Sequence, residues 1–86
     1  MANQNSLENE LNQWNQIIHS RPNHPQAYIR RGMVKFKLAQ IDESITDFDR
    51  AETIAPHLSP YLWQRGLSYY YAQRFEEGAK QFELDL

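Results

Sequence analysis

The stretch that decides the fold is residues 22–56, PNHPQAYIRRGMVKFKLAQIDESITDFDRAETIAP, because its pattern recurs in residues 56–86, PHLSPYLWQRGLSYYYAQRFEEGAKQFELDL. Matching residues lie 34 positions apart, and the matches are Pro22 and Pro56, Arg31-Gly32 and Arg65-Gly66, Phe36 and Tyr70, Glu43 and Glu77, and Phe48 and Phe82. The register also extends backwards in three series, which are Leu7, Ile41 and Phe75; Leu11, Ile45 and Ala79; and Trp14, Phe48 and Phe82. A fixed period of this size is typical of stacked supersecondary units, none of which can bury its apolar face alone.

Composition indicates one soluble globular domain. The chain has 86 residues, of which 41% are hydrophobic and 23% charged, as in an ordinary folded protein. No apolar run approaches the roughly 20 residues that a membrane-spanning helix needs, and the polar N-terminus lacks the pattern of a signal peptide, so a cytoplasmic location is expected. The net charge of −2 argues against nucleic-acid binding. With no cysteine, disulfides and thiolate zinc sites are excluded.

Apolar residues recur at helical spacing and predict five helices, over about residues 6–20, 25–38, 42–55, 59–72 and 76–86. The third helix is expected to bury Ile45, Phe48, Ala51 and either Ile54 or Ala55, and the fifth Phe75, Ala79 and Phe82. Phe48 should touch both its partner helix and the next unit. Gly32 and Gly66 should let a neighbouring helix approach closely, which offsets a helix cost of about 1 kcal/mol relative to alanine.

These residues resemble the tetratricopeptide repeat, a helix-turn-helix unit of 34 residues with the pattern W-x2-L-G-x2-Y, then A-x3-F, then P. The residues that carry the resemblance are Tyr28-x2-Arg31-Gly32, Ser44-x3-Phe48, Ala51 and Pro56 in one unit, and Leu62-x2-Arg65-Gly66-x2-Tyr69 and Gly78-x3-Phe82 in the next. The departures are Arg31 and Arg65 in place of leucine, Lys35 in place of an aromatic residue, and Asp85 in place of alanine. Residues 61–86 are also similar to repeats of cyanobacterial and chloroplast proteins, which adds a photosynthetic compartment as an alternative location.

The resemblance implies an all-α, right-handed helical solenoid of about two and a half repeats. Residues 1–5 would be a flexible N-terminus and residues 6–86 a single domain. Within that domain, 6–22 would be the second helix of an incomplete repeat, 25–58 a repeat, and 59–86 a repeat truncated at its C-terminus. Repeats of this family usually bind other proteins.

In this family the first helix of each unit lines a concave groove. By matching position, the groove-lining residues would be Gln26, Ile29, Arg30, Met33, Phe36, Lys37, Trp63, Gln64, Leu67, Tyr70 and Tyr71, and all but Gln26 form the expected peptide-binding set. The groove-lining helices carry only basic charges, whereas all eleven acids lie on helices of the other class. The carboxylate clamp known in this family needs Lys and Asn where Ile29 and Met33 stand, so a receptor for chaperone tails is not expected.

Two interpretations of the basic residues compete. Arg31 and Arg65 are expected to be held by acids on a neighbouring helix. Arg30, Lys37 and Tyr71, together with Trp63, should instead face a ligand, because arginine and aromatic side chains are the usual anchors of protein interfaces. The expected ligand is an acidic or amphipathic protein segment.

Catalysis has little support in the sequence. His19, His24 and His57 fall at helix ends or in linkers, and neither a zinc-binding histidine pair nor a phosphate-binding glycine loop occurs. We therefore expect a non-enzymatic interaction module or scaffold without a cofactor or metal. Two alternatives are a self-associating structural fragment of a longer repeat protein, without a peptide ligand, and an enzyme accessory domain. Self-association would use the C-terminal helix, where Phe75, Phe82 and Leu86 lie near one stripe and would form a homodimer.

Overall fold

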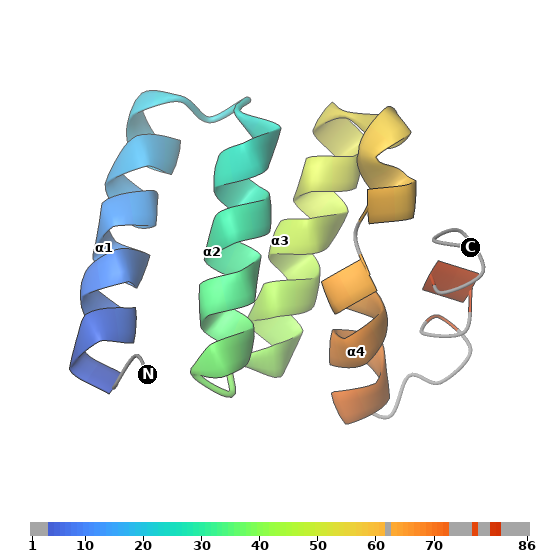
Figure 1. The fold of residues 1–86 in the computed structure, drawn as a ribbon. Coiled ribbons are helices and arrows are strands. Elements are labelled where there is room, and N and C mark those ends of the chain that lie inside the picture. The colour runs from blue at the N-terminus through green and yellow to red at the C-terminus, as the bar shows by residue number, and fades with distance from the viewer. Residues whose placement is uncertain (1–3, 62, 73–76, 78–79, 82–86) are drawn as a thin grey trace.

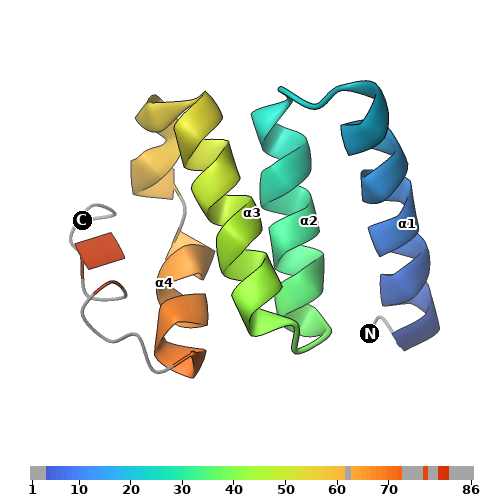
Figure 2. The same cartoon turned by 180° about the vertical axis from the view of Figure 1, so that it is seen from behind.

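The computed structural model of the chain describes residues 4–61, 63–72, 77 and 80–81, and every regular element within them is helical. The elements are α1 (Gln4–Ser20), α2 (Pro25–Lys37), α3 (Ile41–Ile54), the 3-10 helix η1 (Pro56–Tyr61) and α4 (Trp63–Tyr71). Figure 1 shows α1, α2 and α3 side by side in alternating directions, with α4 beyond α3. The reverse view in Figure 2 shows the same order. Thus α2 packs between α1 and α3, and α3 packs between α2 and α4.

The three helices expected before Pro56 are confirmed, with small shifts at their ends. Helix α1 begins at Gln4 rather than Ser6, so residues 4 and 5 belong to the helix and not to the expected flexible N-terminus. Pro25 occupies the first turn of α2, where its missing N–H removes no helical hydrogen bond.

The turn between α2 and α3 is a Schellman motif. The N–H of Ala39 donates to the carbonyl of Phe36 at 2.9 Å, and the N–H of Gln40 donates to the carbonyl of Lys35 at 2.8 Å. Ala39 has a φ of 63°, the left-handed conformation that this motif requires. The two bonds satisfy carbonyls at the end of α2 and direct the chain back into α3.

The fourth helix differs from the expectation of one continuous helix over residues 59–72. The 3-10 helix η1 covers Pro56–Tyr61, and α4 covers Trp63–Tyr71. Pro56 and Pro60 have no N–H to donate to an α-helical ladder, and the N–H of Leu58 bonds to the carbonyl of Ala55, three residues earlier, at 2.9 Å. This is the tighter bonding pattern of a 3-10 turn.

The expected fifth helix falls mostly outside the described residues, which in that stretch are Glu77, Lys80 and Gln81. The described residues thus contain four α-helices. The expected inward residues Phe75, Ala79 and Phe82, and the proposed self-association surface with Leu86, also lie outside the described part of the chain.

The core lies where α3 meets its neighbours. Its buried apolar residues are Leu7, Ala27, Tyr28, Val34, Ile45, Phe48, Ala51 and Ala55. Of the two alternatives at the end of α3, Ala55 is buried and Ile54 only partly so. The hydroxyl of Tyr28 also donates to the carbonyl of Pro22 at 2.8 Å, which ties α2 to the turn before it.

Gly32 permits the close approach of α2 and α3 that the sequence predicted. A Cβ atom at Gly32 would lie 2.8 Å from Cε1 of Phe48, and the Phe48 side chain is fully buried. The ring therefore has no room to move away. The position demands glycine because of this contact and not because of its backbone conformation.

Replacing Gly32 with alanine should destabilise the protein even though alanine favours helix. Overpacking of a core typically costs about 1 to 3 kcal/mol, against a helix gain of about 1 kcal/mol, so we expect a net loss of up to about 2 kcal/mol. Urea unfolding followed by circular dichroism would measure it. Adding Phe48→Leu, which removes the ring atoms, should make the Gly32→Ala change less costly than in the wild type. Equal costs in both backgrounds would contradict the contact.

Candidate functional site: the basic-aromatic face

Arg31 is held inside the helical stack and does not face a ligand. On α2, it donates from Nε and Nη2 to the two carboxylate oxygens of Asp47 on α3, at 2.8 and 2.7 Å. Its Nη1 donates to Asn15 on α1 at 3.1 Å. Lys35 joins the same carboxylate, with Nζ 3.1 Å from Oδ2 of Asp47. The polar atoms of Arg31 thus connect all three of the first helices.

Arg65 repeats this arrangement one unit later. Its Nε donates to Oε1 of Gln81 at 2.8 Å, and its Nη1 to Oδ1 of Asp49 at 3.2 Å. Its Nη2 also binds Glu52 at 2.8 Å. Both arginines therefore bind one residue 16 positions before and one 16 positions after themselves. This recurrence expresses the 34-residue period as a set of contacts, and it confirms that Arg31 and Arg65 bind acids on neighbouring helices.

The hydrogen bonds that Arg31 donates to Asp47 raise the pKa of Arg31 above its ordinary value, and the nearby negative charge adds to the effect although burial opposes it. Because the pKa is raised, the charge on Arg31 contributes its full stabilisation at pH values below the ordinary pKa of arginine. This contribution is lost only as the pH rises through the raised pKa of the folded protein, so Arg31 stays charged under ordinary conditions.

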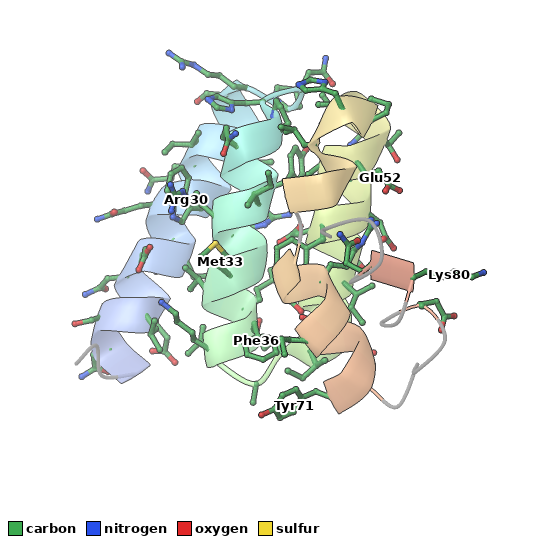
Figure 3. All side chains as sticks on the ribbon, turned by 45° about the vertical axis from the view of Figure 1, so that its right-hand side comes forward. Arg30, Met33, Phe36, Glu52, Tyr71 and Lys80 are labelled. Carbon is green, nitrogen blue, oxygen red and sulfur yellow. The ribbon has the colours of Figure 1, made fainter. Side chains whose placement is uncertain are left out.

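The outward arc of α2 carries the residues predicted to contact a ligand. Arg30 and Lys37 are exposed, whereas Met33 and Phe36 are partly buried. Spacings of three and four residues place them within one arc of the helix. Figure 3 shows Arg30, Met33 and Phe36 in line along this side of α2.

Phe36 links this arc to α4. Its ring meets the ring of Tyr71 edge to face, with centroids 5.3 Å apart and planes at 89°. Such pairs contribute about 0.5 to 1.5 kcal/mol beyond simple burial. Tyr71 is nevertheless 70% exposed, and Figure 3 shows it at the end of α4 beside Phe36. We call the residues Arg30, Met33, Phe36, Lys37 and Tyr71 the basic-aromatic face.

The remaining predicted site residues are placed less fully. Ile29 and Leu67 are partly buried. Trp63, Gln64 and Tyr70 belong to α4 by their backbone, and their side chains lie outside the described part of the structure. The structure thus brings together Phe36 and Tyr71 from two different helices. Lys37 sits beside a small pocket of about 300 Å³ with Leu7, Leu38 and Ala39.

A larger pocket, which the sequence did not predict, lies on α1. It has a volume of about 700 Å³. Its lining includes Gln13, Trp14, Ile17, Ser20, Arg21 and His24, and we call these residues the α1 socket. The signal available in the sequence was the expectation that residues 6–22 are the second helix of a repeat, because a helix without its partner leaves one face uncovered.

No protein-family model, curated protein or solved structure matches this chain. Among the described residues, no group of three or more histidine, aspartate and glutamate side chains is arranged to hold a metal ion. No helix in the described ranges has the length and apolar character needed to cross a membrane.

Proposed function

We propose that this chain is a non-catalytic protein-interaction module of the tetratricopeptide-repeat type, which binds a partner segment on the basic-aromatic face. The observation that carries the proposal is the division of the basic residues. Arg31 and Arg65 are bound internally, whereas Arg30 and Lys37 are exposed and form no ion pair among the described residues. Two exposed cations thus lie on α2, the helix whose Phe36 contacts the exposed ring of Tyr71.

The chemistry of this face favours an acidic segment with one large apolar side chain. Arg30 and Lys37 would attract and orient acidic groups. Charges of this kind change the association rate more than they change the affinity. The Phe36–Tyr71 pair and the thioether of Met33 would receive the apolar anchor, since methionine adapts to irregular surfaces. Met33 and Phe36 lie between the two cations along α2, so the anchor would be flanked by the charges.

An array of acidic peptides, each with a single leucine, phenylalanine or tryptophan anchor, would test the proposal. For the tightest peptide, Tyr71→Ala should lower affinity by about 2 kcal/mol, or roughly thirtyfold, if Tyr71 is a hot spot. Rising salt should weaken binding modestly. Fluorescence anisotropy with labelled peptide measures both effects.

A charge-matched pair of variants provides the control. Arg30→Glu and Lys80→Glu change the net charge equally, and Lys80 is exposed on the other side of the molecule (Figure 3). Arg30→Glu should weaken binding much more than Lys80→Glu. Equal losses from both variants would mean that the peptide responds only to total charge, and an array without any saturable binder would reject the proposed ligand class.

A further inference from the structure

The outermost helix, α1, has a covered and an uncovered side. Helix α3, its counterpart one repeat later, packs against both α2 and α4, whereas α1 packs against α2 (Figures 1 and 2). Residues of α1 and of the turn that leads to α2 line the α1 socket. Because α1 and α3 are related by the 34-residue period, the contacts of α3 indicate which contacts the equivalent residues of the socket could make.

At the positions of the socket, residues of α1 are more exposed than the equivalent residues of α3. Phe48 and Ala51 of α3 are fully buried, but Trp14 and Ile17, which lie 34 positions earlier, are only partly buried. In α3 the Phe48 ring packs against Gly32 of α2. In α1 the equivalent positions line the socket, so the socket corresponds to a helix-binding surface that no helix of the described residues fills.

The contacts of α3 define which helix would fit. The Phe48 ring lies against Gly32, where no Cβ fits, and the preceding residue, Asp47, accepts two hydrogen bonds from Arg31. An Arg-Gly pair therefore places arginine on the acceptor and glycine over the ring. In α1 the ring is Trp14 and the residue before it is Gln13.

Gln13 has the right chemistry for this role. Its equivalent two units later is Gln81, whose side-chain oxygen accepts a hydrogen bond from Nε of Arg65 at 2.8 Å. An amide at this position of the repeat is thus already used to bind an arginine within the same protein. Gln13 is exposed and is available to do the same for an incoming helix.

We propose that the α1 socket binds in trans a helix of another polypeptide that carries an Arg-Gly pair. Its arginine donates to Oε1 of Gln13, and its glycine packs on the ring of Trp14. A folded second copy of this chain does not offer such a helix, because Gly32 is covered by Phe48 and Gly66 is buried. The socket shares no lining residue with the basic-aromatic face, so this inference does not depend on the proposed function.

The chain itself supplies the probe for a test. A labelled, helix-stabilised peptide of residues 25–40, PQAYIRRGMVKFKLAQ, contains the Arg31-Gly32 pair, and its binding to the full chain is measured by fluorescence anisotropy. Saturable binding is expected. Peptides with Arg31→Ala or Gly32→Leu should bind about tenfold or more weakly, because one loses the hydrogen bonds and the other places a side chain against Trp14.

Variants of the full chain locate the bound peptide. Trp14→Ala and Gln13→Ala should each weaken binding about tenfold or more, whereas Asn12→Ala, exposed on α1 outside the socket, should leave it unchanged. Gln13 is exposed, so Gln13→Ala is expected to fold, and circular dichroism checks this for each variant. Absence of binding would overturn the proposal. Binding that is insensitive to Gln13 and Trp14 would also overturn it, because a peptide that exchanges with the chain's own α2 would behave in this way. Self-association of the chain that is abolished by Trp14→Ala would overturn it as well, because the socket would then bind a second copy.

Discussion

Replacing Phe48 with alanine is expected to lower the free energy of unfolding by about 3 to 5 kcal/mol, as for other buried aromatic side chains. Phe48 is fully buried, and its ring fills the space that Gly32 leaves open at the contact of α2 with α3. Removing the ring leaves a cavity where α3 packs against α2, and α3 is the helix that contacts both α2 and α4. Since small domains are stable by only about 5 to 15 kcal/mol, the variant should be close to unfolding at room temperature.

Thermal and urea unfolding measure this loss, and the repeat supplies a matched control. Trp14 occupies the same place on α1 but is only partly buried and lines the α1 socket. Trp14→Ala should therefore cost clearly less than Phe48→Ala, although tryptophan is the larger side chain. A Phe48→Ala protein that melts like the wild type, or a Trp14→Ala protein that loses as much stability, would contradict the assignment of the core.

The period made the interior of the stack predictable from sequence. Once Arg31 and Arg65 are placed at equivalent positions, charge alone indicates that acids on the neighbouring helices will bind them, and the structure confirms both. Gly32 was predictable for a similar reason, since a glycine inside a helix needs a steric explanation. Phe48, the ring it faces, belongs to the strongest apolar series in the sequence.

Other features depend on context that the pattern does not contain. Pro56 and Pro60 lie in the same short segment, which forms η1 rather than the start of an α-helix. The repeat pattern considers each proline separately and does not predict their combined effect. Lys35 departs from the repeat pattern that the sequence resembles, and the sequence alone did not indicate a partner for it. In the structure its Nζ lies 3.1 Å from Oδ2 of Asp47, so this side chain is held by an ion pair.

Of the two candidate surfaces, one was predictable from the sequence and the other was not. The outward residues Arg30, Lys37 and Tyr71 follow from helical geometry, and all three are exposed as expected. The α1 socket was not predicted, because the apolar series places Trp14 with Phe48 and thereby implies equal burial. Burial requires a neighbour as well as an apolar side chain, and among the described elements α3 packs against α2, η1 and α4, whereas α1 packs mainly against α2.

Removing the Asp47 carboxylate should be about as damaging as removing the Phe48 ring. The Asp47 side chain is 3% exposed and binds Arg31 and Lys35, whose side chains are 18% and 16% exposed. Asp47→Ala would leave two largely buried cations next to each other without their shared anion. Loss of one partner from a buried ion pair costs about 3 to 5 kcal/mol, because the remaining charge stays desolvated.

Two further variants separate this effect from the loss of any acid. Asp49 also binds an arginine, but its side chain is 50% exposed, so Asp49→Ala should cost no more than about 1 kcal/mol. Asp47→Asn should fall between the two, because its amide oxygen still accepts from Arg31 as Gln81 accepts from Arg65, while the charge of Lys35 is no longer balanced. Urea unfolding at neutral pH, where Arg31 is charged, gives the three values. If Asp47→Ala and Asp49→Ala were equally mild, the cluster would be a surface ion pair and Arg31 would be free to serve another role.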